Sequence, residues 1–187
     1  MIWQFHSDKT QNWAYMDNLF TPEECAQIIA IGNSKLEKAT IVGGEVNKDI
    51  RESQISWLSP NDLEFAFRRV TDGVLNLNSQ FFNFDLFGLA EGFQFTRYDA
   101  PTGHYGMHID KMLNGPVRKL SLTIQLSSPE DYEGGELALQ FDKEADVMPK
   151  ELGKMIVFPS YILHKVRPVT KGTRYSLVAW VTGKPFK

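Results

Sequence analysis

The sequence has little of what several classes of protein require. It contains a single cysteine, Cys25, so no internal disulfide can form, and a reducing compartment, the cytoplasm, is expected. A net charge of -3 at pH 7 leaves no excess of basic residues, which argues against a nucleic acid as partner. No uncharged apolar run approaches the roughly 20 residues that span a bilayer. The first residues also lack the basic and apolar regions of a signal peptide, so we expect no membrane partner.

Internal repeats, low-complexity tracts and linkers are also lacking, and we therefore expect the 187 residues to form a single domain. Two helices are predicted in the first half of the chain. They begin at capping signals in residues 21–24 and 59–62, each with a proline at the first helical position, and end near Gly32 and Ser79. An apolar stripe in the second helix recurs at steps of three and four residues and is predicted to pack on the core: Leu63, Phe67, Val70, Val74 and Leu77.

Short strands are predicted to dominate the remainder. One extended segment, 51–58, precedes the second helix, and the glycine-rich segment 43–49 before it is expected to be a mobile hairpin tip. The strands predicted beyond Gly92 cover 93–98, 105–110, 118–127, 135–141, 154–158, 164–169 and 173–182. This order indicates a mainly β fold with flanking helices (α+β), a sandwich or a barrel. Five phenylalanines near the end of the second helix and beyond are expected to pack in the core or between helix and sheet: Phe81, Phe82, Phe84, Phe87 and Phe93.

The predicted strand around residues 119–126 has two different faces. One face is apolar and the other carries polar side chains: Leu120, Leu122, Ile124 and Leu126 against Lys119, Ser121, Thr123 and Gln125. An apolar face packed on helices and a polar face lining a small lumen would produce this alternation. A polar face exposed to solvent would produce it equally well, so both arrangements stay open here.

A candidate metal site begins with His108 and Asp110. The two side chains lie two residues apart in an extended segment, so they point to the same face and can converge on one ion. The remaining histidines, His6, His104 and His164, are the candidates for a third ligand, and His164 is preferred because a well-patterned strand with a basic residue follows it. Two histidines and one carboxylate form the facial triad of non-haem Fe(II) oxygenases, which leaves three metal positions open. By itself, a His-x-Asp pair in a strand is more often structural.

Arg174 is a second candidate. Alternation along the last predicted strand places it on one face with Ser176, Val178 and Trp180. A guanidinium on a face that is otherwise largely apolar is costly to bury unless it meets an anion. The pattern therefore predicts a carboxylate ligand near Arg174.

Together these motifs resemble a known family. The resemblance rests on Arg97-Tyr98, on His108-Ile109-Asp110 and His164, on the segments 120–127 and 132–137, and on Phe158-Pro159 and 168–174. The chain is similar to 2-oxoglutarate/Fe(II)-dependent dioxygenases of the prolyl 4-hydroxylase-like group, and most similar to the PKHD-type hydroxylase branch. This resemblance implies a double-stranded β-helix, also called a jelly roll and cupin-like, with its core in residues 93–187. Residues 1–92 would supply helical support and a substrate lid that includes 43–49.

The resemblance also implies roles for individual residues. His108, Asp110 and His164 would be the iron ligands and the catalytic centre, and Arg174 would hold the distal carboxylate of the cosubstrate 2-oxoglutarate. Three further residues are expected at the cosubstrate: Tyr98, Gln125, which stands where some prolyl hydroxylases place a tyrosine, and Thr123, two residues from Gln125. Five residues are candidates for substrate contact: Tyr105, Arg118, Trp180, Trp57 and Arg51. Core packing is the alternative for both tryptophans, and a solvated strand end is the alternative for Arg118.

The implied reaction is the hydroxylation of a C–H bond. O2 and 2-oxoglutarate are consumed, succinate and CO2 are formed, and L-ascorbate is a further expected cofactor. The presence of Asp110 favours hydroxylation, because halogenating relatives lack this carboxylate. The expected substrate is a prolyl residue of a protein or peptide. The alternatives are a free amino acid or another small molecule as substrate, and a non-catalytic metal-binding jelly-roll module.

Overall fold

A computed structural model describes residues 11–39, 47–89, 91–110 and 115–185. Two α-helices lie in the first half of the chain, and strands make up most of the rest. In order the elements are β1 (Ala14–Met16), α1 (Pro22–Asn33), β2 (Glu37–Lys38), β3 (Arg51–Glu52), β4 (Gln54–Leu58), α2 (Pro60–Leu77), η1 (Asn78–Phe82), β5 (Leu86–Leu89), β6 (Phe93–Asp99), β7 (His104–His108), β8 (Arg118–Gln125), η2 (Pro129–Asp131), β9 (Tyr132–Gly134), β10 (Leu137–Gln140), β11 (Ala145–Val147), β12 (Met155–Pro159), β13 (Leu163–Val166) and β14 (Val169–Gly183).

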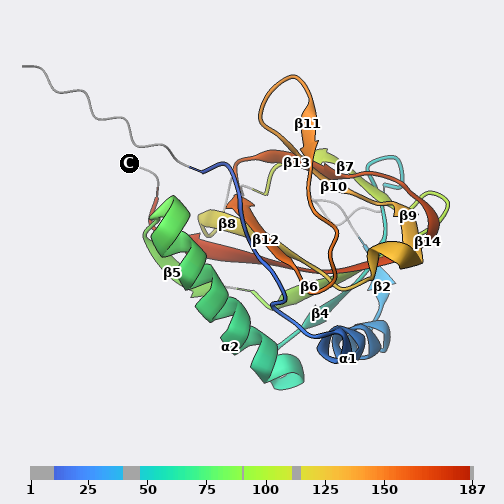
Figure 1. Cartoon of the computed structure of the whole chain (residues 1–187), viewed down its shortest axis with the longest axis horizontal. Helices are drawn as coiled ribbons and strands as arrows, with labels where there is room; N and C mark the ends of the chain where they lie inside the picture. Colours follow the sequence, from blue (N-terminus) through green and yellow to red (C-terminus); the bar gives the residue numbers. More distant parts are fainter. Residues whose placement is uncertain (1–10, 40–46, 90, 111–114, 186–187) are drawn as a thin grey trace, which may run out of the picture.

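The strands form two antiparallel sheets. The larger has the order β1-β12-β8-β14-β6-β4-β2, with β5 and β9 paired to β14, and the smaller has the order β11-β10-β13-β7-β3. The smaller sheet lies over one side of the larger sheet, and both α-helices lie on the opposite side (Figure 1). Two facing antiparallel sheets with helices outside confirm the predicted mainly β jelly roll with flanking helices.

Both helices begin at the predicted capping signals. The backbone N–H of Glu24 donates to Thr21 Oγ1 (3.3 Å), and the N–H of Thr21 donates back to Glu24 Oε2 (2.9 Å). The N–H of Ser59 likewise donates to Asp62 Oδ2 (2.8 Å). These bonds satisfy backbone groups that a helix start leaves without partners.

The main core lies between the helices and the larger sheet. The apolar residues of β8 and the stripe of α2 belong to one buried cluster, which includes Leu120, Leu122, Ile124, Val70 and Val74. The polar face of β8 is buried as well: Lys119, Ser121, Thr123 and Gln125 are at most 6% exposed. Of the two arrangements open from the sequence, the lumen is therefore the one observed. Polar side chains line the space between the sheets, and this is where a site is to be sought.

Two strand predictions need correction. The predicted strand 51–58 is interrupted at Ser53, because β3 pairs with β7 in the smaller sheet while β4 pairs with β6 in the larger one. The chain thus changes sheets where an uninterrupted strand was expected. The predicted strand 164–169 also divides: β13 ends at Val166, and Val169 already belongs to β14. Pro168 stands between them and has no N–H for a ladder.

The prediction that the phenylalanines pack in the core or between helix and sheet is only partly correct. Phe82 and Phe93 are buried, whereas Phe87 is 73% and Phe81 37% exposed.

Strands that precede residue 93 enter both sheets, and the division of the domain at residue 92 stays a prediction. His6 and residues 43–46 of the predicted lid lie outside the described residues. Within the described ranges, no helix combines the length and the apolar character needed to cross a membrane.

Candidate active site

Three metal-capable side chains meet between the sheets. β7 ends at His108, Asp110 follows two residues later, and His164 on β13 pairs with His108 across the ladder. His108 Nε2 lies 3.6 Å from Asp110 Oδ1, and His164 Nε2 lies 3.4 Å from Asp110 Oδ2. The ligand atoms of the three residues all lie within 4.8 Å of one another. This is the spacing at which two imidazoles and a carboxylate can share one ion.

The surroundings of the triad hold each ligand in a suitable orientation. Nδ1 of His108 lies 2.8 Å from the Gly106 carbonyl oxygen, and Nδ1 of His164 lies 2.9 Å from that of Ile162. A proton on each Nδ1 satisfies these contacts and leaves the Nε2 lone pairs directed at the centre. The hydroxyl of Ser121 donates to Asp110 Oδ2 (2.7 Å).

The electrostatics favour the protonation states that bind a metal. Burial lowers the pKa of His108 to about 4, and the neighbouring His164 lowers it further than Asp110 raises it. Burial on its own raises the pKa of Asp110. Hydrogen bonding and the charge of His164, together with His108 and Ser121, outweigh burial, so the pKa of Asp110 lies below its usual range. At neutral pH a neutral His108 and an ionised Asp110 are therefore available as ligands.

Arg174 on β14 contacts the same polar face of β8 as the triad: it bonds Gln125, and Asp110 bonds Ser121, four residues earlier on that face. Its side chain is 1% exposed, its Nη2 donates to Gln125 Oε1 (2.9 Å), and its guanidinium lies 5.5 Å from the centre of the Tyr98 ring. Its Nε and Nη1 have no hydrogen-bond partner among the described residues. A buried guanidinium with unused N–H groups fits a carboxylate ligand, which can accept from two of them. Thr123 is buried on the same lumen-facing side of β8 as Gln125.

The candidate substrate residues form two groups. In the first, Trp57 and Trp180 have ring centres 6.2 Å apart, and the Arg118 guanidinium lies 3.9 Å above the Trp180 ring. Arg118 also donates to Glu91 Oε1 (2.6 Å) and to the backbone oxygen of Asp110 (3.4 Å). It is therefore held beside the triad and is not a solvated strand end. Trp57 is 42% exposed, which excludes simple core packing for it.

The second group is stacked on the triad. Tyr105 lies parallel to His108 with ring centres 3.7 Å apart, and the Arg51 guanidinium lies 4.5 Å from the centre of the Tyr105 ring. Arg51 is buried and donates to Gln94 Oε1 (2.9 Å). His104 does not reach this group, since its ring nitrogens face the backbone oxygens of Thr102 and Asp49.

Two residues that lie beside Asp110 and Arg174 were not predicted from the sequence. Ser121 was assigned only to the polar face of β8, yet it holds Asp110. Tyr132 was part of a quoted motif with no role assigned, yet it is buried with an unpartnered hydroxyl. The alternation of β8 was the available signal for Ser121, and no comparable signal existed for Tyr132.

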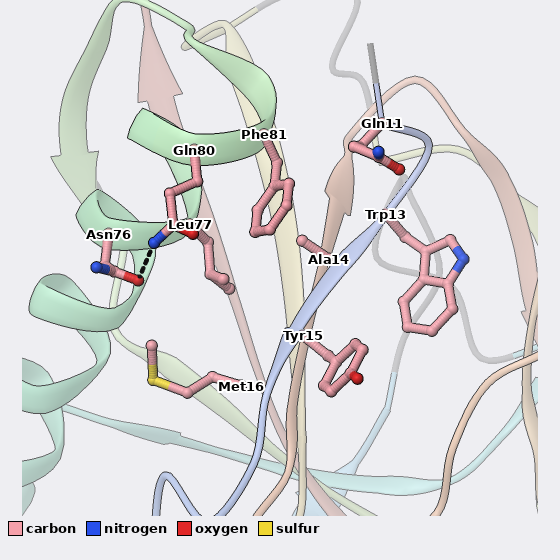
Figure 2. A pocket seen from close by; sticks show the side chains of 9 residues that line it. All are labelled: Gln11, Trp13, Ala14, Tyr15, Met16, Asn76, Leu77, Gln80 and Phe81. Carbon is pink, nitrogen blue, oxygen red and sulfur yellow. Dashed lines mark hydrogen bonds between the residues drawn. The ribbon is translucent and has the colours of Figure 1, made fainter. Parts of the chain in front are cut away.

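A separate groove lies between β1 and the end of α2 (Figure 2). Its volume is about 580 Å³. Its lining combines apolar and amide side chains: Gln11, Trp13, Ala14, Tyr15, Met16, Asn76, Leu77, Gln80 and Phe81. None of these residues was predicted to bind a metal, cosubstrate or substrate, and none belongs to the triad.

Comparisons with solved structures and with protein families define the class of this chain. A prolyl hydroxylase from Trichoplax adhaerens, solved with a peptide fragment of hypoxia inducible factor, has a TM-score of 0.79 at 15% identity and aligns over 92% of this chain and 84% of its own. A prolyl-4-hydroxylase from Pseudomonas putida has a TM-score of 0.70 at 22% identity, with 94% and 95% covered. These two share the fold. The family model of the 2OG-Fe(II) oxygenase superfamily matches residues 93–182.

Relatives in sequence narrow the class further. PKHD-type hydroxylases from Nitrosomonas europaea and Gloeothece citriformis are each 32% identical to this chain, over 177 and 168 residues. The alignments cover 89% and 86% of this chain, and 76% and 73% of the two relatives. The chain belongs to the 2-oxoglutarate/Fe(II)-dependent oxygenase superfamily, as a PKHD-type hydroxylase. It is thus a dioxygenase that uses Fe(II) and 2-oxoglutarate, and both the triad and Arg174 fit these groups.

Proposed function

We propose that this enzyme hydroxylates a prolyl residue of a protein or peptide, with succinate and CO2 as coproducts. The observation that carries the proposal is that three convergent metal-capable side chains and a buried guanidinium with unused N–H groups contact one polar face of β8, through Ser121 and Gln125. The similarity in fold to prolyl hydroxylases, one of them solved with a peptide, supports the choice of substrate.

In this proposal His108, Asp110 and His164 hold the metal. The two Nε2 atoms and the Asp110 carboxylate would be its ligands, and Ser121 keeps the carboxylate in place. Bound Fe(II) supplies the redox chemistry that couples 2-oxoglutarate decarboxylation and O2 to oxidation of the substrate. L-ascorbate would serve as a reductant that keeps the iron ferrous.

Arg174 binds the far carboxylate of 2-oxoglutarate and so orients the cosubstrate along the pocket. Gln125 fixes the guanidinium by accepting from Nη2, and the Tyr98 ring covers one side of it. Thr123, on the same lumen-facing side of β8, lines the wall beside them. Because these side chains are held in place before binding, little conformational entropy is lost when the cosubstrate enters.

The substrate enters beside Trp57, Trp180 and Arg118. Trp180 Nε1 and Arg118 Nε are buried donors that have no partner within the described ranges. A peptide backbone offers carbonyl oxygens that can accept from such donors, and the exposed Trp57 ring offers a surface on which a prolyl ring can pack. Arg51 and Tyr105 form the wall on the other side of His108.

We infer the cytoplasm as the place of action, since the single cysteine is buried and unpaired.

The test is a comparison of substrates with the purified protein, Fe(II), 2-oxoglutarate and ascorbate. A library of proline-containing peptides and a panel of free amino acids are incubated separately, and mass spectrometry detects products with one added oxygen atom. We expect hydroxyproline in a peptide, accompanied by succinate. Hydroxylation of a free amino acid alone would replace the peptide proposal with the small-molecule alternative. No Fe(II)-dependent succinate formation with any substrate would contradict the assigned activity.

A further inference from the structure

Tyr132 opens β9 and lies beside the segment that leads into Arg174. It pairs with Gly172, two residues before Arg174, and its side chain is 3% exposed. Its hydroxyl makes no well-formed hydrogen bond among the described residues, and the same holds for Nε and Nη1 of Arg174, although the hydroxyl and the guanidinium lie close enough to interact. Buried polar atoms are nearly always partnered in folded proteins. A group of unpartnered polar atoms at one place therefore indicates that a ligand belongs there.

The Tyr132 ring and the Arg174 side chain are immediate neighbours. A Cβ placed on Gly135 would lie 2.8 Å from Val169 Cγ2, 3.1 Å from Arg174 Cδ and 3.3 Å from Tyr132 Cε2, so the glycine backbone packs closely against both side chains. Gly135 also has a φ of +65°, which favours glycine independently. The two side chains are thus held next to each other by a backbone that leaves room for both.

The Tyr132 hydroxyl is available as a donor. Burial raises the pKa of Tyr132 more than the charge of Arg174 and its contact with the hydroxyl lower that pKa, so the phenol keeps its proton at neutral pH. The guanidinium can approach only a lone pair of the hydroxyl oxygen, so the O–H itself stays free to donate. Lys150 Nζ lies 4.0 Å from the centre of the Tyr132 ring and donates to the Gly134 backbone oxygen (3.1 Å). A cation on the ring face withdraws electron density and strengthens the O–H as a donor.

We propose that Tyr132 is a second binding residue for the far carboxylate of 2-oxoglutarate. Its O–H donates to one carboxylate oxygen, while the free N–H groups of Arg174 donate to the other. A carboxylate has enough lone pairs for all of these bonds. The inference rests on the proposed role of Arg174, and it adds a specificity: the pair selects dicarboxylic 2-oxoacids over those that end in a methyl group.

Simple packing is the competing explanation. Tyr132 belongs to a small buried cluster with Tyr98, Val166 and Val169, and its ring contributes to that cluster whatever the hydroxyl does. If packing were its whole role, phenylalanine would replace it without effect on ligand binding, because only the unpartnered hydroxyl would be lost.

Calorimetric titration of the Mn(II)-loaded protein separates the two explanations. The titrated ligands are 2-oxoglutarate and pyruvate, which has the 2-oxoacid group but no far carboxylate. In Tyr132→Phe we expect the Kd for 2-oxoglutarate to rise about tenfold or more, as for loss of a hydrogen bond to a charged group, and the Kd for pyruvate to stay unchanged. Tyr175→Phe is the matched control, since Tyr175 stacks on Phe95 on the other side of β14, and it should bind both ligands as the wild type does.

An unchanged Kd for 2-oxoglutarate in Tyr132→Phe would overturn the inference while leaving the proposed function intact. Equal weakening of both ligands would also overturn it, because the residue would then shape the whole pocket. If the wild-type protein itself binds no 2-oxoglutarate, the proposed role of Arg174 fails together with the inference. The thermal midpoint and the Mn(II) affinity of each variant without 2-oxoacid show whether it is folded and keeps its metal site.

Discussion

The two faces of the larger sheet serve different purposes. The face toward the helices is apolar and fully packed, with Leu120, Leu122 and Ile124 at 0% exposure. The lumen face is just as buried, but it carries Arg174, Tyr132 and Trp180, each with a buried atom that has no partner in the described residues. The first face stabilises the fold, whereas the second holds polar groups at a cost in stability, and in our proposal a ligand supplies their missing partners. Substitutions on the helix-facing side should therefore change the free energy of unfolding, whereas substitutions on the lumen face should change ligand affinity.

The largest effect is expected on the lumen face, at the metal site. Asp110→Ala removes the anionic member of the triad, and we expect Mn(II) affinity to fall by at least about 100-fold, because loss of a mere supporting group already costs 10–100-fold. Succinate formation should be abolished. Metal titration by calorimetry is the measurement, and the exposed Asp72→Ala on α2 is the control. Retention of wild-type metal affinity in Asp110→Ala would remove Asp110 from the proposed ligand set.

The helix-facing side is tested by Leu122→Ala. Leu122 is 0% exposed within the main core, so truncation leaves a cavity and should lower the free energy of unfolding by about 3 kcal/mol. Urea denaturation measures this change. Leu75→Ala is the matched control, because Leu75 on α2 is 53% exposed and its loss should cost below about 0.5 kcal/mol.

The same variant should keep its ligand affinity. At a temperature where Leu122→Ala is folded, its Kd for 2-oxoglutarate should equal that of the wild type. A weakened Kd would show that the two faces are coupled and that the division between them is wrong.

Arg174→Met should have opposite effects on binding and stability. It replaces a buried guanidinium with an apolar side chain of similar length, and we expect 2-oxoglutarate binding to weaken by about 2–4 kcal/mol. The stability of the ligand-free protein should stay the same or rise, because the cost of burying an under-partnered charge is removed. Thermal midpoints with and without 2-oxoglutarate measure both effects. A lower midpoint without ligand would mean that Arg174 stabilises the fold as well.

The features of the two faces that follow from local periodicity could be predicted from the sequence alone. Alternation along β8 separated its two faces, and the spacing of His108 and Asp110 placed both on one side. Contacts between distant segments were beyond such reasoning. The transfer of the chain from one sheet to the other at Ser53 depends on partners in β7 and β6. Phe87 looked like a core residue, but among the described residues β5 pairs with β14 alone, and the Phe87 side chain faces solvent.

The residues of the candidate active site could likewise be predicted only where a local pattern marks them. Arg174 could be found because a charge interrupts an otherwise largely apolar face. Tyr132 could not be found, since a buried tyrosine is ordinary and only its position beside Arg174 gives its hydroxyl a meaning. Local patterns thus identify unusual residues, whereas ordinary residues acquire a role through tertiary contacts that the sequence does not display.

The smallest expected effect lies furthest from the lumen, at the start of α1. Thr21→Ala removes the acceptor for the Glu24 N–H and should lower the free energy of unfolding by about 1 kcal/mol. Thr71→Ala is the control with the opposite expectation: the Thr71 hydroxyl bonds the Phe67 carbonyl within α2, and alanine there is neutral or stabilising. Urea denaturation measures both variants. Since neither residue touches the lumen, both variants should bind 2-oxoglutarate with the wild-type Kd, and a change in Kd for Thr21→Ala would extend the functional face of the molecule to its helical layer.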